Sequence, residues 1–334
     1  MYGRGSGGHK ALVHECPSDG SELIPELPTD VDALWIHSDN REVPGMARLL
    51  ARLVAAQDRW ARPLGDFNHR WLKALFGPIR PIKDFLNGTW LGHPLHSAIT
   101  DVPIGTLTLA VVFDVLDMRV AADIALLATV LVMLAAAVSG AADYVDTDST
   151  ARTRATLHST LMVVGLVLVV LSLVIRATGP VDRLLPIVLS IVAFLVVNAG
   201  AFVGGEVVYA FGNMVNRHAF RCAGAKWIAL DVGDVTDIAA LPEATPTKAR
   251  AGINDLLLVR MGSTVHALHA TCAHAGGPLP QGTVVDGCIE CPWHGSRFRL
   301  NDGHVARGPA LYDQPAYEIR AAEGGGFEVR RSAT

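Results

Sequence analysis

The sequence predicts a multidomain membrane protein, in which a four-helix transmembrane α bundle precedes a C-terminal all-β domain. Half of the 334 residues are hydrophobic and only 18% are charged, whereas ordinary soluble proteins have roughly 25% charged residues. The apolar residues are concentrated between residues 95 and 212. Beyond residue 217 the composition is that of a soluble domain, with short β-rich runs between glycine-containing turns.

The overall charge and the cysteine content exclude two further classes of protein. The net charge is −4, from 28 basic and 32 acidic residues, without the basic excess of a nucleic-acid-binding protein. Five cysteines in 334 residues are too few for a small scaffold held by disulfides. We therefore expect no nucleic acid among the partners.

The N-terminal ninety residues are expected to form a tail and then a helical segment. Residues 1–45 have no apolar core and predict a flexible tail rather than a signal peptide. Residues 46–90 are interpreted as an amphipathic, membrane-surface helical segment. Their leucines recur at helical spacing among arginines, and Trp60, Trp71 and Phe76 follow. A helix that packs on the soluble domain would show the same pattern.

Four apolar runs lie within residues 91–215, which we interpret as a four-helix transmembrane domain. A helix that spans a bilayer needs about 20 apolar residues. The runs cover residues 95–116, 124–142, 156–175 and 184–205. The last three runs contain no Asp, Glu, Lys or Arg. Transmembrane helices are therefore favoured over the buried helices of a soluble bundle.

The lysines and arginines beside these runs predict the orientation in the membrane. Those before the first run are Arg48, Arg52, Arg59, Arg62, Arg70, Lys73, Arg80 and Lys83. Arg217, Arg221 and Lys226 follow the fourth run. An even number of spans places both termini on one side, and the excess of positive charge marks that side as the cytoplasm. We expect a multi-pass protein of the cell inner (plasma) membrane with cytoplasmic N- and C-termini. Residues 216–225 are the expected linker, and residues 226–334 the soluble domain.

Two short motifs in the C-terminal domain carry the most specific signal. Cys272 and His274 form a C-x-H motif, and Cys291 and His294 form a C-x-x-H motif after sixteen intervening residues. Two thiolates and two imidazoles can hold a [2Fe–2S] cluster, with the cysteines on one iron and the histidines on the other. A tetrahedral zinc site is the alternative, with Cys288 as a rival ligand. The paired spacing favours the cluster, because zinc sites more often use two C-x-x-C pairs.

The motifs TCAHAGGPLPQG, CIECPWHGSRFRLNDG and RGPALYDQPAYEIR resemble the two cluster loops and the Gly-Pro loop of the Rieske ferredoxin family. The resemblance covers roughly residues 226–331 and implies a small antiparallel β fold with the cluster at one exposed tip. It also implies that Ser296, Phe298 and Pro309 lie around the cluster.

Two departures from the respiratory Rieske proteins are expected to matter. Those proteins join their cluster loops by a disulfide, at positions that Gly277 and Trp293 occupy here. They also have a tyrosine hydroxyl near the cluster where this chain has Phe298. Because the loss of a hydrogen-bond donor near the sulfurs lowers the reduction potential, we expect a low-potential cluster.

The transmembrane region contains candidates for a second site. Ionisable residues within membrane helices are costly and are therefore functional candidates. They are His93, His96, Asp101, Asp143, His158 and Glu206, all expected at the cytoplasmic end of the bundle. Two histidines from different helices, such as His96 and His158, could hold haem b. The carboxylates and histidines could instead hold another metal ion or a quinone head group, and simple hydrogen bonding at helix ends remains an alternative.

The segments LGHPLHSAITDVPIG, SGAADYVDT and GGEVVYAFG resemble an uncharacterised bacterial four-helix membrane family that is often fused to Rieske ferredoxin domains. Together the two resemblances imply a membrane-anchored Rieske iron–sulfur electron-transfer protein. It would pass single electrons at the cytoplasmic membrane face to or from a redox partner protein. The alternatives are a quinone- or haem-linked membrane oxidoreductase and an iron–sulfur redox sensor. No nicotinamide or flavin fingerprint is present, so we expect an electron carrier or an oxidoreductase component with no catalytic residue of its own.

Overall fold

The computed structural model describes residues 45–179, 182–219, 226–233, 235, 237, 240–323 and 325–332, with side chains from residue 49 onward. These residues fall within one structural unit, which spans residues 44–334. The expected tail, apart from its last residue, and residues 220–225 of the expected linker lie outside the described residues.

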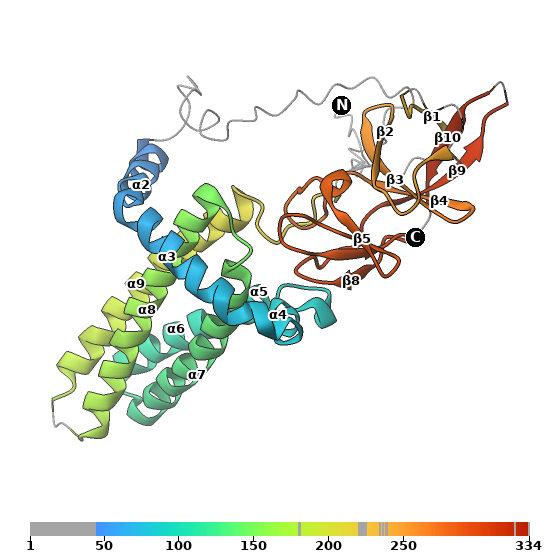
Figure 1. Cartoon of the computed structure of the whole chain (residues 1–334). Coiled ribbons are helices and arrows are strands. Elements are labelled where there is room, and N and C mark those ends of the chain that lie inside the picture. The colour runs from blue at the N-terminus through green and yellow to red at the C-terminus, as the bar shows by residue number, and fades with distance from the viewer. Residues whose placement is uncertain are drawn as a thin grey trace, which may run out of the picture. The chain divides into compact units, whose positions relative to one another are not determined.

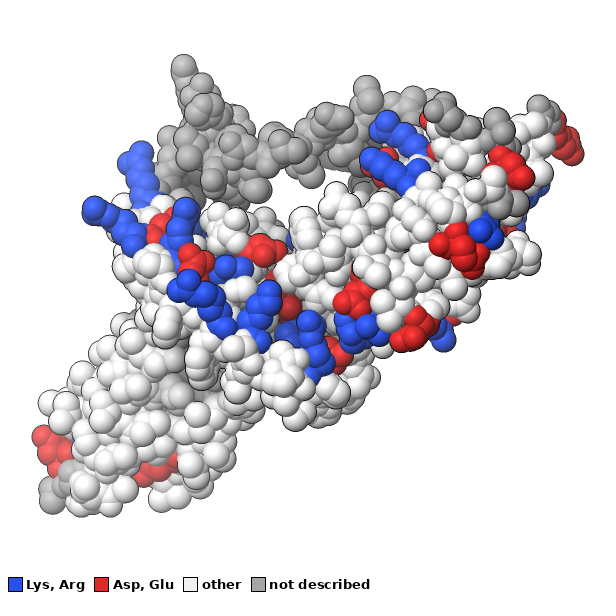
Figure 2. Space-filling view, in the orientation of Figure 1, with Lys and Arg blue, Asp and Glu red and all other residues white. Residues whose placement is uncertain are grey.

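Four helices are long and apolar enough to cross a membrane, as the sequence predicts. The first span, Leu95–Val115, is divided into α5 (Leu95–Ile99) and α6 (Asp101–Val115). The other three are α7 (Arg119–Tyr144), α8 (Ser149–Ala177) and α9 (Leu184–Tyr209). The division falls just before Pro103, which thereby lies in the first turn of α6, where the missing N–H of proline breaks no helix hydrogen bond. Figure 2 shows the sides of this bundle almost free of charged residues.

The spans are arranged as two hairpins. Helix α6 packs closely on α7, and α8 packs closely on α9, while α7–α8 and α6–α9 contacts join the hairpins (Figure 1). Helices α6 and α8 therefore lie diagonally across the bundle. The core between the helices contains Leu107, Leu126, Met133, Val169 and Val197. Leucine and valine side chains elsewhere on the spans are exposed, which is the pattern of a bundle whose outer surface faces lipid.

The segment before the spans is helical, as expected, and it packs on the bundle. It comprises α2 (Gly45–Ala55), α3 (Asp58–Phe76), a 3₁₀ turn (Gly77–Ile79), α4 (Arg80–Asn87) and a second 3₁₀ turn (Thr89–Leu91). Helix α3 contacts α7 and α8, and α4 contacts α7. At the end of α4 the chain turns at Gly88, whose φ of 87° suits glycine.

The opposite face of α3 is apolar and exposed. Its exposed residues are Trp60, Leu64, Phe67, Trp71 and Leu75, and they recur at spacings of three and four. The residues of α3 that are buried are Ala61, Gly65 and Phe76. Helix α3 thus has one face that packs on the bundle and a separate apolar face that the described residues leave exposed.

The C-terminal domain consists of two antiparallel sheets, as the resemblance implies. The larger has the order β1-β10-β9-β4-β3-β2 and the smaller the order β5-β6-β7-β8 (Figure 1). The strands of the larger sheet are β1 (Ile228–Leu230), β2 (Thr247–Ala251), β3 (Asn254–Met261), β4 (Thr264–His269), β9 (Ala316–Ala321) and β10 (Phe327–Arg331). Those of the smaller sheet are β5 (Thr283–Val285), β6 (Cys288–Glu290), β7 (Arg297–Arg299) and β8 (Val305–Arg307). His266 and His269 are residues of β4, which precedes the first cysteine–histidine motif.

Candidate metal centre

The two metal-binding motifs lie on two loops that fold in the same way. The first loop follows β4, and the second joins β6 to β7. The N–H of Cys272 donates to Gly277 O at 2.8 Å, and the N–H of Cys291 donates to Ser296 O at 2.8 Å. A glycine with positive φ, Gly276 in one loop and Gly295 in the other, donates back to the carbonyl of each cysteine at 3.0 Å. Each loop thereby turns sharply around its cysteine.

The four candidate ligands come together as a pair of thiols and a pair of imidazoles. The thiols of Cys272 and Cys291 are hydrogen-bonded to each other. The ring centroids of His274 and His294 are 5.1 Å apart. Two cysteines on one side and two histidines on the other are the donor set that a Rieske-type [2Fe–2S] cluster requires.

The electrostatics of the thiols suit a site for metal. The Cys272 thiol donates to the Cys291 sulfur, which lowers the pKa of Cys291 to about 6 and raises the pKa of Cys272 well above its usual range. The backbone N–H groups of His274 and Ala275 donate to the Cys272 sulfur and oppose that rise. The N–H groups of Trp293 and His294 donate likewise to Cys291. These donors stabilise thiolate, the form that binds iron.

The imidazole of His274 is in the state that a metal ligand needs. Burial lowers its pKa well below 6.5, so the ring is neutral. Its Nε2 is buried without a hydrogen-bond partner among the described residues. Gly277 adds to the fit, because a Cβ there would lie 2.8 Å from Cys291 Sγ and 3.2 Å from the Trp293 ring. The residues present therefore fit a [2Fe–2S] cluster.

The residues that the resemblance places around the cluster have different contacts. Ser296 is buried and its Oγ accepts from Ala310 N at 3.0 Å, which leaves its hydroxyl proton free to donate. Phe298 is fully buried in the core and offers no donor. Pro309 lines a small gap beside His274. The low-potential expectation rests on the missing donor at Phe298 and stays a prediction.

Sequence reasoning missed Gln314, which holds the first loop. Its Oε1 accepts from Ala273 N at 2.9 Å, and its Nε2 donates to the carbonyls of His269 and Thr271. A fully buried glutamine with all these bonds is a structural clamp. No spacing rule relates it to the motif some forty residues earlier, so only the fold reveals it.

Cys288, the rival ligand for zinc, lies apart from the four candidate ligands. It is buried on β6, and the charged groups that affect its pKa are Asp286, Arg297, Arg299 and Asp302. Across the described ranges, no three His, Cys, Asp or Glu side chains converge as they would around a single metal ion. The separate thiol and imidazole pairs match a two-iron cluster better than one tetrahedral ion.

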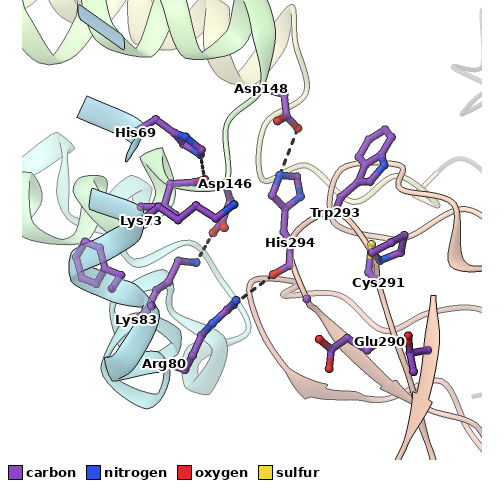
Figure 3. A pocket seen from close by; sticks show the side chains of 16 residues that line it. His69, Lys73, Arg80, Lys83, Asp146, Asp148, Glu290, Cys291, Trp293 and His294 are labelled. Carbon is purple, nitrogen blue, oxygen red and sulfur yellow. Dashed lines mark hydrogen bonds and ion pairs between the residues drawn. The ribbon is translucent and has the colours of Figure 1, made fainter. Parts of the chain in front are cut away.

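The cluster loops are covered, which differs from the exposed tip that the resemblance implies. His294 Nε2 lies 3.3 Å from Asp148 Oδ2 in the loop between α7 and α8, and Arg80 Nη1 donates to His294 O at 3.3 Å (Figure 3). His274 adjoins Met214 and Val215, which follow α9. The side chain of His294 is only 11% exposed. The reason is that the helical segment and the span-connecting loop occupy the space in front of the tip.

A cavity of about 300 Å³ lies between the second cluster loop and the helical segment (Figure 3). Its charged and histidine lining residues are His69, Lys73, Arg80, Lys83, Asp146, Asp148, Glu290 and His294. Two of these, Lys83 and Asp146, form a buried ion pair at its wall. The pair joins α4 to the α7–α8 loop and was not anticipated from the sequence.

The six ionisable residues of the membrane domain do not meet at one point. His96 and His158 face each other, with ring centroids 6.1 Å apart. Asp143 is buried and accepts from Asn87 Nδ2 at 2.6 Å. Glu206 pairs with Arg154 at 3.5 Å. The other two, His93 and Asp101, are exposed.

The opposite end of the bundle has a charge cluster that the sequence analysis did not predict. Arg176 is buried and pairs with Asp114 at 2.6 Å and with Asp123 at 3.0 Å, while Arg183 also pairs with Asp123. Residues from three helices and the α8–α9 connection meet here. Their pairing could not be read from sequence, because the partners are more than fifty positions apart.

The fold and the donor set define the class of protein, a membrane-bound iron–sulfur protein of the Rieske type. The profile of the Rieske [2Fe-2S] domain family matches residues 231–318, and that of a predicted membrane protein family (DUF2231) matches residues 92–217. The chain belongs to the Rieske [2Fe-2S] family through its C-terminal domain, fused to a DUF2231 membrane domain. Its cofactor is a [2Fe–2S] cluster.

Two relatives are small ferredoxins. The anthranilate 1,2-dioxygenase ferredoxin subunit of Burkholderia cepacia is 32% identical over 82 residues, which cover 25% of this chain and 76% of that protein. Ferredoxin CarAc of Metapseudomonas resinovorans is 33% identical over 75 residues, 22% of this chain and 70% of that protein.

Larger proteins match over the same domain. The chain spans only 11% of the length of apoptosis-inducing factor 3 from Mus musculus and Homo sapiens, at 33% identity over 69 residues. One chain of a solved complex of reduced oxygenase and oxidized ferredoxin in carbazole 1,9a-dioxygenase is about the size of this domain. It is 29% identical, with a TM-score of 0.26, and the match covers 29% of this chain and 98% of that chain.

Proposed function

We propose that this protein is a membrane-anchored carrier that passes single electrons, at the cytoplasmic face of the inner membrane, to or from a redox partner protein. A Rieske electron-transfer role and a membrane domain are its established parts. The observation that carries the proposal is the paired arrangement of two thiols and two imidazoles in a chain with four apolar helices. The cluster, when bound, takes up and releases one electron.

The chain's own residues hold the cluster and shield it. We propose Cys272, Cys291, His274 and His294 as its ligands. The backbone N–H groups that donate to both sulfurs stabilise negative charge there. Gln314 fixes the first loop, and the packing of the tip on the helical segment leaves the side chain of His294 only 11% exposed. Such shielding reduces the rearrangement of solvent that accompanies a change of charge.

The charges support the cytoplasmic orientation, and the apolar face of α3 supports a position of this helix at the membrane surface. Lysines and arginines gather over α2, α3 and α4, in a band between the uncharged bundle and the β domain (Figure 2). Trp60, Phe67 and Trp71 are exposed on α3 in the same region. Tryptophan and basic residues together favour the interface between lipid and water. We infer that α3 lies in the membrane surface while its other face packs on the bundle.

The proposal of a protein partner draws on two relatives that are ferredoxins, one of which is named as a subunit of a dioxygenase. The side of the second cluster loop that carries Trp293 remains accessible, since this side chain is half exposed. A partner that approaches over Trp293 would come close to Cys291 without displacing the helical segment. We infer that electrons enter or leave by this side.

The test uses the full chain, purified in detergent and reduced with dithionite. We expect the electron paramagnetic resonance spectrum of a Rieske cluster and the uptake of one electron equivalent for each cluster. Cys272→Ser removes a proposed ligand and should abolish the signal. Cys288→Ser, the matched control in the same domain, should retain it. A preparation that contains zinc in place of iron contradicts the proposal, as does a full signal in Cys272→Ser.

A further inference from the structure

Two histidines face each other across the diagonal of the transmembrane bundle. His96 lies on α5, at the start of the first span, and His158 lies on α8. Their ring centroids are 6.1 Å apart and their planes are nearly perpendicular, at 82°. Histidine within a membrane span is costly, so a facing pair calls for an explanation beyond packing.

Both rings are held by the same kind of hydrogen bond. His96 Nδ1 lies 2.8 Å from Ala136 O on α7, and His158 Nδ1 lies 2.8 Å from Gly200 O on α9. A carbonyl can only accept, so each Nδ1 carries the proton and each Nε2 keeps its lone pair. The same tautomer, fixed by the same bond, is the usual state of a histidine that binds metal through Nε2.

Two glycines make room for the rings. Gly140 follows Ala136 by four residues, and a Cβ there would lie 2.9 Å from the His96 ring. Gly204 follows Gly200 by four residues, and a Cβ there would lie 2.8 Å from the His158 ring. Each hairpin therefore supplies one histidine, one carbonyl and one glycine in the same relation. These small residues serve ring placement as well as close helix packing.

The distance between the rings suits one metal ion between them. A metal–imidazole bond is about 2.0 Å long, and ring bonds near 1.33 Å give the imidazole a radius of about 1.1 Å. Two imidazoles on opposite sides of one ion would therefore have centroids about 6.2 Å apart. The observed 6.1 Å agrees. A free ion would need at least two more ligands, and no third His, Cys, Asp or Glu converges on this point in the described part of the chain. A tetrapyrrole would bring the remaining ligands with the ion.

We propose that His96 and His158 are the two axial ligands of a b-type haem within the bundle. A quinone fits less well, because its carbonyl oxygens need donors and both Nε2 atoms offer lone pairs. The two hairpins contact each other less closely than the helices within each hairpin do, and neither ring is fully buried. A planar macrocycle would enter between the hairpins, where packing is loosest.

The haem would lie within reach of the cluster. His158 is ten residues beyond Asp148, which is about 15 Å along the α8 axis, and Asp148 contacts His294. One electron could leave the reduced cluster and convert ferric haem iron to ferrous iron, with no bond made or broken. This exchange rests on the proposed electron-carrier function, whereas the haem ligation does not.

The experiment measures haem in the full chain, produced in cells supplied with iron and a haem precursor and purified in detergent. We expect a reduced-minus-oxidised visible spectrum of low-spin haem b, with haem close to equimolar with protein. The haem content of His96→Ala and of His158→Ala should each fall more than about tenfold below that of the wild type, while both variants keep the Rieske signal. His93→Ala, three residues away and exposed, is the matched control and should keep its haem.

A second pair of variants tests the geometry without removing a ligand. Gly140→Ala and Gly204→Ala place a methyl group against the rings and should lower haem content or shift the haem bands. Gly105→Ala, whose Cβ would meet nothing within 4 Å, should change neither.

Two results would overturn the proposal: wild-type protein that holds its cluster and no haem, or loss of haem in His93→Ala equal to that in His96→Ala. Wild-type protein with haem and no cluster would instead overturn the proposed carrier function and leave the ligation standing.

Discussion

At the scale of single residues, packing takes the place of a covalent link between the cluster loops. Where the respiratory Rieske proteins have cysteines, this chain has Gly277 and Trp293. The Trp293 ring lies 3.2 Å from the position a Cβ of Gly277 would take, so the glycine lets the indole close over the loop. Unlike a disulfide, this contact does not depend on redox conditions.

The substitution Gly277→Ala tests that close contact. Its Cβ would lie 2.8 Å from Cys291 Sγ, which forces a candidate ligand to move and costs on the order of 1–3 kcal/mol. We expect less iron and acid-labile sulfide in the purified variant, with a weaker Rieske signal. Gly105→Ala in the bundle is the control. Equal iron content in the two variants would show that the loop adjusts without loss.

Asp148 is the acidic group that touches a candidate cluster ligand. Its carboxylate lies 3.3 Å from His294 Nε2, and this hydrogen bond holds the pKa of Asp148 below its usual range. The group is therefore an anion at neutral pH. A negative charge beside the cluster opposes the addition of an electron and lowers the reduction potential.

We expect Asp148→Asn to raise the reduction potential by tens of millivolts, since about 59 mV corresponds to a tenfold change in equilibrium for a one-electron couple. A redox titration of the Rieske signal measures the change. Asp117→Asn removes the same charge at the opposite end of the bundle, where Asp117 is exposed and pairs with Arg119, and should leave the potential unchanged. A lower potential in Asp148→Asn contradicts this electrostatic account.

The residue scale also shows how far the sequence could predict the site. Cys272, His274, Cys291 and His294 could be chosen from spacing alone, because each pair lies on one short loop. Asp148 could not, since its approach to His294 depends on the docking of segments 146 positions apart (294 − 148). The sequence suggested His96 and His158 as one pair among six candidates, but it could not show that they face each other, because that depends on how the helices pack.

At the scale of elements, α4 is attached to the α7–α8 loop by a buried polar network. Lys83 pairs with Asp146, and both side chains are almost fully buried. Lys83 Nζ also donates to Asn87 Oδ1 at 3.1 Å, and Asn87 in turn donates to Asp143. The periodicity of residues 46–90 predicted a helix and its amphipathic character, but a single lysine among many gave no sign of burial.

Lys83→Met tests the network by leaving Asp146 buried without its partner, which costs about 3–5 kcal/mol for ion pairs of this kind. We expect a lower thermal unfolding temperature in detergent. Burial raises the pKa of Asp146 above 3.8, and the loss of Lys83 raises it further. The folded variant then favours the protonated carboxyl, so its stability should decline as the pH rises from acidic to neutral.

The double variant Lys83→Met/Asp146→Leu serves as the control for that experiment. It removes both charges, and replacement of a whole buried pair by apolar residues is often close to neutral. Recovery of most of the lost stability, together with a loss of its pH dependence, is the expected outcome. If the double variant is as unstable as Lys83→Met, then packing of the lysine stem rather than charge accounts for the effect.

At the scale of the whole molecule, the four spans and the β domain could be predicted because their signals are local. Uncharged runs of about 20 residues and short alternating runs each report on their own segment. Orientation is a property of the whole chain. The predicted orientation places Arg119, Arg176 and Arg183 on the side opposite the cytoplasm, and the structure pairs all three with aspartates. Their charge is thereby offset at that end of the bundle.

The orientation predicts which turns a membrane-impermeant maleimide can reach in intact cells. A cysteine in place of Asp117, between α6 and α7, or of Gly179, between α8 and α9, should be labelled from outside, because the predicted orientation places both at the non-cytoplasmic end. A cysteine in place of Asp302, in the turn between β7 and β8, should be labelled only after the cells are opened. Labelling is scored against the wild-type chain with its own five cysteines. An even number of spans places both ends of the chain on the same side. Labelling of the Asp302 variant in intact cells would therefore show that the topology is the reverse of the predicted one, with the cluster at the outer face.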